Sequence, residues 1–131
     1  MDIIKIYKQF PDQSSCIKCL EEIRWNNVPE CPYCKSINQT RMPKEHRYHC
    51  NNCNTSFSVT VGTVFHKTKI DLQKWFVAIS LILNAHRGIS SRQLARDINV
   101  TKDTAWYIQM KIKKAFIEYG ELFIGINEVL E

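Results

Sequence analysis

Apolar residues recur at helical spacing in two separate parts of the chain. The first part lies between Asp12 and Trp25, directly after Pro11. This spacing predicts a short amphipathic helix, with Asp12 or Ser14 as its N-terminal cap. Its apolar positions are Cys16, Cys19, Leu20 and Ile23.

Between residues 29 and 62 the helical pattern gives way to cysteine pairs, turn residues and alternating apolar positions. Alternation is typical of a half-buried strand, and the clearest run is Phe57, Val59 and Val61. This block is predicted to be a small β unit.

Helical spacing returns after residue 69 and continues to about Tyr119, with breaks that divide it into three helices. Gly88 is expected to end the first helix. Ser90 and Gln93 have the spacing of a capping box, so the second helix begins at Ser90. Asn99 tolerates left-handed backbone geometry and permits a turn, after which Thr101 caps the third helix. The apolar positions are Leu72, Trp75, Phe76, Ile79 and Leu83 in the first helix, and Ile108, Ile112 and Phe116 in the third.

Neither a membrane span nor a secretion signal is expected. The longest apolar run, residues 75–83, is much shorter than the ~20 residues that cross a bilayer. The first ten residues lack the basic and apolar regions of a signal peptide. We therefore expect a reducing compartment: the cytoplasm, near the nucleoid in a bacterium, or the nucleus in a eukaryote.

Six cysteines in a reducing compartment favour metal binding over disulfides. Cys31-Pro-Tyr-Cys34 and Cys50-Asn-Asn-Cys53 are two Cys-x-x-Cys pairs separated by fifteen residues. This spacing predicts one structural zinc per chain with four protein ligands and no open position for water. The alternative is two unrelated pairs of buried or redox-active thiols.

Cys16 and Cys19 are spaced as a third pair and raise the possibility of a second zinc. They would need further ligands, for which His46, His49 and His66 are the available imidazoles. Because both cysteines share the apolar face of the predicted helix, buried thiols are the preferred interpretation.

These elements together predict an α+β fold, in which a small zinc-ribbon β unit precedes a helical bundle with a helix-turn-helix. The expected division is residues 1–67 for the N-terminal helix and zinc ribbon, 68–120 for the helix-turn-helix domain, and 121–131 for an acidic C-terminal segment.

Positive charge concentrates in two blocks of the chain, whose formal net charge is +5. Residues 41–69 carry five basic and one acidic side chain, and residues 87–114 carry seven against two. Such blocks are expected of a protein that holds a phosphate backbone at two places, although two solvated faces would give the same pattern. Double-stranded DNA is the predicted partner, and no small-molecule substrate is indicated.

The segment from Ile89 to Lys114 has the spacing of a helix-turn-helix, with small Ala95 where two helices approach closely. The second helix of this motif enters the major groove by its N-terminal residues. An ordinary helical hairpin is the alternative, and Trp106 would suit a core position as well. The predicted DNA contacts are Lys102, Thr104, Trp106 and Tyr107 in the groove, and Arg92, Arg96, Thr101 and Lys67 near phosphates.

The order of these motifs resembles the N-terminal half of bacterial insertion-sequence transposases related to eukaryotic Merlin transposons, which pair a zinc ribbon with a DDE catalytic domain. The likeness covers nearly the whole chain, and its most specific part is GTVFHKTK directly after the ribbon. The matching residues are Cys16, Leu20, Arg24, Trp25, Cys31, Pro32, Cys34, Cys50, Cys53, Phe57, Gly62, Thr63, Phe65, His66, Leu72, Trp75, Leu94, Thr104, Ala105 and Trp106.

The chain departs from that family in two places. Lys35 and Asn54 follow the cysteine pairs where glycine is usual. The family continues as G-x-V-E-V-D-E, in which the aspartate binds the catalytic metal, but here Leu130 takes that position and the chain ends at Glu131. The resemblance therefore implies recognition of transposon-end DNA without strand transfer and without catalytic residues in this chain.

Three partners or roles stay open beside that one. A domesticated transcriptional regulator, or a competitor of full-length transposase, would make the same DNA contacts. Full-length transposase or a second copy of the chain could be a protein partner. A zinc ribbon that docks on another protein is the remaining alternative.

Overall fold

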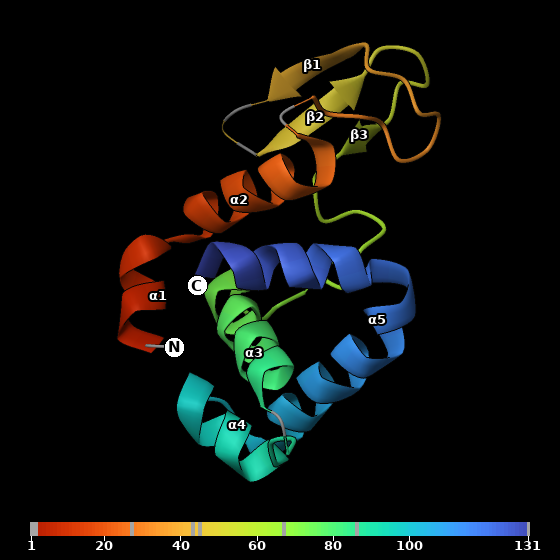
Figure 1. Cartoon of the computed structure of the whole chain (residues 1–131). Helices are drawn as coiled ribbons and strands as arrows, with labels where there is room; N and C mark the ends of the chain where they lie inside the picture. The colour runs from red at the N-terminus through yellow and green to blue at the C-terminus, as the bar shows by residue number, and fades with distance from the viewer. Residues whose placement is uncertain are drawn as a thin grey trace.

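The computed structural model describes residues 3–26, 28–42, 44, 46–66, 68–85 and 87–130, apart from the Tyr119 side chain. A three-stranded antiparallel sheet lies at one end and a group of helices at the other (Figure 1). This arrangement confirms the predicted α+β class. The elements are α1 (Ile3–Gln9), α2 (Gln13–Trp25), β1 (Gln39–Met42), β2 (Arg47–Cys50), β3 (Ser56–Phe57), α3 (Leu72–Asn84), α4 (Ser91–Ile98) and α5 (Lys102–Leu130).

Helix α2 forms as its sequence predicts. The Asp12 carboxylate accepts a hydrogen bond from the Ser15 amide at 2.9 Å, and the two residues complete a capping box. Such a cap satisfies amides that have no partner within the helix. The helix buries Cys16, Cys19 and Leu20 against the helical core.

The strand expected to run through Val61 ends at Phe57. Val59 and Val61 are buried as the alternating pattern implied, but they lie in turns, with the Val61 amide donating to Ser58 O at 3.2 Å. The carbonyls of both valines accept hydrogen bonds from the Arg24 guanidinium. The side chain from α2 therefore satisfies backbone groups that a neighbouring strand would otherwise pair.

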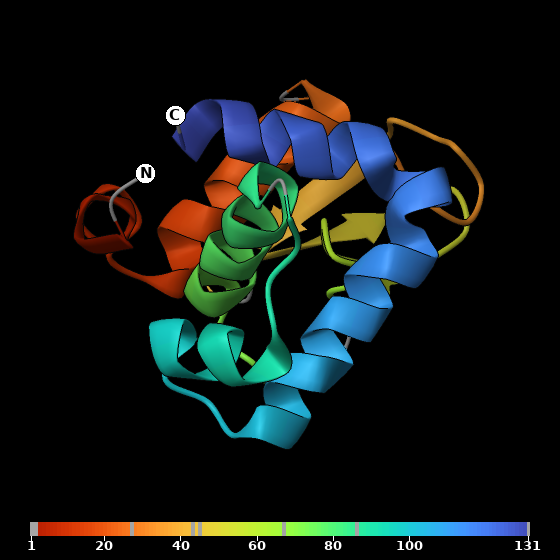
Figure 2. The same cartoon turned by 60° about the horizontal axis from the view of Figure 1, so that its bottom comes forward.

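Helix α3 is the centre of the helical part and is covered by α2, α4 and α5 (Figures 1 and 2). It is shorter than predicted: it ends at Asn84, whereas the sequence predicted an end near Gly88. Ala85 is already extended, at φ −86° and ψ 94°. Gly88, at φ 82°, instead closes the following turn by donating its amide to Ala85 O.

Helix α5 continues well past the end predicted near Tyr119. It bends strongly in its middle, and its second arm lies across α2 and α3 (Figures 1 and 2). Phe123, Ile126 and Leu130 keep the helical spacing and are buried, while Asn127 accepts from the Ser80 hydroxyl at 2.9 Å. Residues 121–130, expected as a separate acidic segment, are thus the last turns of a packed helix.

Helix α1 was not predicted, because its apolar face is short. Ile6 is buried, and the Phe10 ring after the helix packs edge-on against Phe76 of α3 at 5.4 Å. None of the helices in the described parts of the chain has the length and apolar character needed to cross a membrane.

Candidate metal centre and nucleic-acid interface

The four cysteines of the two Cys-x-x-Cys pairs converge on one point. Their sulfur atoms all lie within 4.8 Å of one another, with 3.6 Å between Cys31 and Cys53 and 3.4 Å between Cys34 and Cys50. All four are free of disulfides. Within the described ranges, no other cluster of three or more potential ligand side chains of this kind is found.

Each pair sits on the same backbone turn. Cys31 donates its amide to Ser36 O and accepts from the Lys35 amide, while Cys50 does the same with Thr55 and Asn54; all four bonds measure 2.9 Å. The turn requires a left-handed residue, and Lys35 and Asn54 have φ angles of 65° and 56°. These are the two positions where glycine was expected, so the knuckle geometry persists without glycine.

Backbone amides make this cluster suitable for thiolates. The amide of Cys53 lowers the pKa of Cys50 to about 6 against the opposing effect of burial, and the Asn52 amide adds to the lowering. At Cys34 the Ser36 amide also lowers the pKa, but the hydrogen bond with the Cys50 sulfur, burial, and the hydrogen bonds with Cys31 and Cys53 together outweigh it and raise the value to about 12. Backbone amides thus favour the thiolate form at Cys50.

Four sulfur ligands at such distances suit a tetrahedral zinc ion, whose thiolate bonds are about 2.3 Å long. The cluster could hold one zinc, and the protein fills every coordination position. Beneath it, Trp25 packs edge-on against Tyr48 and Phe57 at 5.8 and 5.7 Å. Cys31, Cys50 and Phe57 are wholly buried, so the metal centre and a small aromatic core form one unit.

Cys16 and Cys19 belong to the helical core. Burial raises the pKa of Cys16 to about 12 and that of Cys19 to about 11, which keeps both thiols protonated. His46 bonds the Ser14 hydroxyl at 2.9 Å. The metal-ligand cluster of the described chain includes neither these cysteines nor a histidine, in agreement with the buried-thiol interpretation.

The second candidate site is the pair α4 and α5. The Ser90 hydroxyl accepts from the Gln93 amide at 3.1 Å and caps α4, as predicted, but the Gln93 side chain turns to Asp97 and Arg96 and does not close the capping box. Asn99 ends the helix at φ 56° and ψ 57°. Thr101 then caps α5 by accepting from the Thr104 amide at 3.2 Å. The turn buries Leu94, Ala95, Ile98, Ala105 and Ile108.

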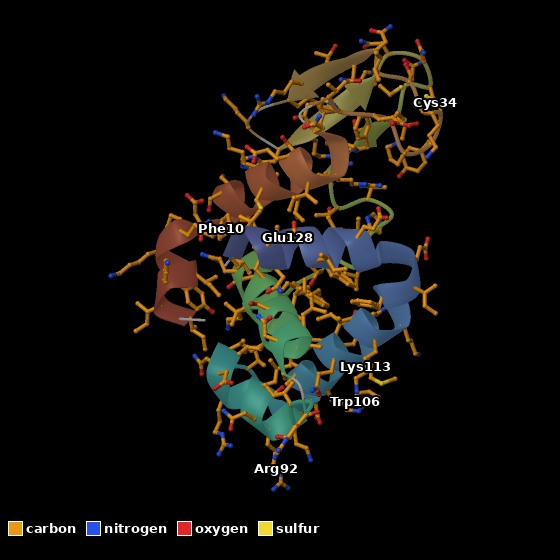
Figure 3. All side chains as sticks on the ribbon, viewed as in Figure 1. Phe10, Cys34, Arg92, Trp106, Lys113 and Glu128 are labelled. Atoms are coloured by element: carbon orange, nitrogen blue, oxygen red, sulfur yellow. The ribbon has the colours of Figure 1, made fainter. Side chains whose placement is uncertain are left out.

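Most of the predicted DNA contacts lie exposed on this pair of helices. Arg92 extends away from the body of the molecule, and Trp106 lies near the start of α5 (Figure 3). Trp106 is 57% exposed, so the idea that it packs in the core is wrong. Thr104 is half-buried, and its hydroxyl accepts from Thr101 at 2.9 Å. Arg96, Thr101, Lys102 and Tyr107 are exposed, and Lys67 lies outside the described residues.

Three further cations were not singled out from the sequence. Lys111 lies over the Tyr107 ring, 5.5 Å from its centroid, and Lys113 and Lys114 are exposed on the following turn. They belong to the basic block of residues 87–114, so the distribution of charge along the sequence could have identified them. Lys111 follows Tyr107 by four residues, so the helix brings the two side chains together, and the contact holds the ammonium group over the ring.

Comparison with known proteins gives two matches. Residues 11–56 match the family model of the transposase zinc-ribbon domain. The chain is also similar to an uncharacterized protein in transposable element ISH50 of Halobacterium salinarum, at 31% identity over 102 residues. That alignment covers 76% of this chain and 34% of the relative, so the chain spans about a third of the length of that protein. No solved structure matches the chain. These matches support a relationship with insertion-element transposases.

Proposed function

We propose that the chain is the zinc-dependent DNA-binding module of a transposase-like protein and recognises transposon-end DNA. The observation that carries this proposal is the capped α4–α5 pair, which exposes cationic and aromatic side chains on one surface. The likeness of residues 11–56 to a transposase zinc ribbon supports the choice of DNA. The finer assignment to Merlin-related transposases with a DDE domain is part of the same proposal.

Recognition starts at the N-terminus of α5. In a helix-turn-helix this end enters the major groove, where Lys102, Trp106 and Tyr107 would face base edges. Arg92 and Arg96 on α4 flank it and would contact the phosphate backbone. Thr101 and the first amides of α5 provide a further phosphate site, because a helix N-terminus favours negative charge. Lys67 is proposed as an additional phosphate contact.

Zinc has a structural role in this proposal. Cys31, Cys34, Cys50 and Cys53 would hold one ion, which supplies folding free energy to a ribbon that has a very small core of its own. With four protein ligands the ion has no position for water or a phosphate oxygen. The metal thus keeps the ribbon folded against Trp25 and takes no part in chemistry.

The module binds DNA and does not cut it. Two-metal phosphoryl transfer needs several carboxylates that converge on divalent ions. On the last turns of α5, Glu128 is exposed and Leu130 is buried, so the position of the family's aspartate points into the core. Transposon-end DNA incubated with the protein and Mg²⁺ or Mn²⁺ should stay intact. Nicking that disappears in Glu128→Ala would contradict this part of the proposal.

Footprinting tests the function directly. The purified protein should protect the ends of its element more strongly than host promoter fragments, whereas a regulator would protect promoters. Arg96→Gln should weaken the protection, because Arg96 is exposed and lies on the proposed interface. Lys8→Gln is the matched control, since Lys8 is an exposed cation on α1 and outside the interface. Equal protection of every fragment tested would contradict end recognition.

A second candidate is supported by apolar side chains near the zinc knuckle. Val28, Tyr33 and Ile37 are 56%, 59% and 66% exposed. Contiguous apolar side chains at a surface mark sites of protein–protein interaction. Weak DNA binding that does not respond to salt would favour this candidate, and a Tyr33→Ser variant with unchanged DNA affinity is expected under the proposal above.

A further inference from the structure

The exposed face at the start of α5 is aromatic at its centre. Trp106 is 57% and Tyr107 45% exposed, whereas Trp75 in α3 is wholly buried. In the described part of the chain the Trp106 indole has no hydrogen bond or ring contact. The Tyr107 ring is different, because Lys111 lies over it at 5.5 Å. Trp106 is therefore the aromatic side chain whose faces are open to a ligand.

The same face offers few polar side chains that could read a base edge. Adenine is typically read by the amide of Asn or Gln, and guanine by Arg or Lys. Residues 102–112 contain one such amide, Gln109, which is only 8% exposed. Its oxygen accepts from the Ser91 hydroxyl at 2.5 Å and its nitrogen donates to Ile89 O at 2.7 Å. Both amide atoms of Gln109 are thus used in hydrogen bonds that connect α5 to α4 and to the segment before it, and Gln109 does not face a base.

The other polar side chains at the start of α5 further limit which base features this face can contact. The Thr104 hydroxyl is engaged with Thr101 in the helix cap. Lys102 and Asp103 are exposed on the first turn of α5. Lys102 can donate a hydrogen bond to guanine, and Asp103 can accept one from cytosine. The middle of the face has the aromatic pair, of which the Trp106 ring is the larger exposed apolar surface. The base feature that suits an apolar surface in the major groove is the C5-methyl group of thymine.

We infer that α5 reads thymine through contact of the Trp106 ring with its C5-methyl group, so that A·T pairs are selected at the centre of the contacted site. This inference rests on the proposed function, because it requires α5 to lie in the major groove. Arg92 and Arg96 on α4 and Lys111 on α5 are exposed cations, and in this inference they hold the phosphates beside the aromatic pair. Charge thus supplies affinity, and Trp106 supplies discrimination among bases.

The experiment compares thymine with uracil, which forms the same base pair and lacks only the methyl group. A duplex is first selected by the zinc-loaded wild-type protein from a pool randomised over about two helical turns. It is then synthesised with deoxyuridine in place of thymidine, and both forms are titrated by fluorescence anisotropy. Each contacted methyl removed should weaken binding about fourfold, as expected for one apolar group returned to water.

Two variants test whether the preference for thymine over uracil depends on Trp106. Trp106→Ala should bind the thymine and uracil duplexes equally, and its exposed position means that folding does not depend on the ring. Ile117→Ala is the matched control, because Ile117 is 98% exposed on the same helix and outside the proposed contact. This control should keep the preference for thymine. Loss of the preference in Ile117→Ala, or its retention in Trp106→Ala, would overturn the assignment to Trp106.

The outcomes separate this inference from the proposed function. Equal wild-type affinity for the two duplexes, with binding that still weakens in salt, would overturn thymine reading and leave DNA binding intact. Single-stranded DNA bound as tightly as the duplex would also overturn it, because the ring would then stack on bases. Failure to bind any duplex would remove the proposed function itself.

Discussion

Replacing Arg24 should weaken the connection between the ribbon and the helical part and cause a measurable loss of stability. The Arg24 guanidinium donates to Val59 O at 2.5 Å and to Val61 O at 2.7 Å, and it lies 5.7 Å from the Trp25 ring centroid. Hydrogen bonds from a charged donor contribute about 1.5–3 kcal/mol each. Because both bonds share one half-exposed group, we expect Arg24→Met to lower the free energy of unfolding by about 3 kcal/mol in total.

A lysine at this position should recover only part of that loss. Its ammonium is a compact charge and lacks the planar fork that spans both carbonyls, so Arg24→Lys should lie about midway between wild type and Arg24→Met. Lys18→Met is the control, because Lys18 is an exposed cation on the same helix. It should change the free energy of unfolding by less than about 0.5 kcal/mol.

Urea titration at fixed free zinc measures these differences, followed by circular dichroism and by tryptophan fluorescence. The slope of free energy against urea should stay unchanged, since the native fold is retained. A loss below about 1 kcal/mol for Arg24→Met, or full recovery by lysine, would refute the view that the two carbonyl bonds carry the connection.

Three further outcomes are expected. Cys31→Ser should lose zinc by elemental analysis and unfold the ribbon, whereas Cys16→Ser should keep one zinc per chain; two zincs in the wild type would contradict the assignment. The folded pKa of Cys50 is about 6 against an ordinary 9.0, so its contribution to stability is complete above pH 9.0 and is lost as the pH falls toward 6. Zinc release followed with a colorimetric chelator should therefore increase with acidification, and release that does not change with pH would be inconsistent with thiolate ligands. Lys35→Gly should raise the melting temperature by a few degrees, because a left-handed residue other than glycine costs about 1–2 kcal/mol and the glycine entropy offsets only part of it; a lower melting temperature would count against strain at Lys35.

Local features of the fold could be predicted from the sequence. The caps at Asp12, Ser90 and Thr101 are each set by a side chain that accepts from a backbone amide three residues later. The left-handed turn at Asn99 follows from the tolerance of asparagine for that backbone geometry. The clustering of the four cysteines also follows from spacing, because a two-residue gap brings both sulfurs of a knuckle together.

Features that depend on distant partners could not be predicted. β3 stops at Phe57 because Arg24, more than thirty residues earlier in the chain, satisfies the carbonyls of Val59 and Val61. The length of α5 likewise depends on α3, whose Ser80 bonds Asn127. The sequence did not decide whether Trp106 is exposed or buried. Helical spacing alone does not show which face of α5 packs against the other helices and which face stays exposed.

The central claim, that α4 and α5 bind duplex DNA, is tested most directly by the salt dependence of affinity. Zinc-loaded protein is titrated into a fluorescent duplex at several salt concentrations, and the logarithm of the binding constant is plotted against that of the salt. Arg92 and Arg96, with one phosphate each, predict a line with a slope of about −1.8 or steeper, and Arg96→Gln should reduce its magnitude by about 0.9. A slope near zero for the wild-type protein would contradict the claim.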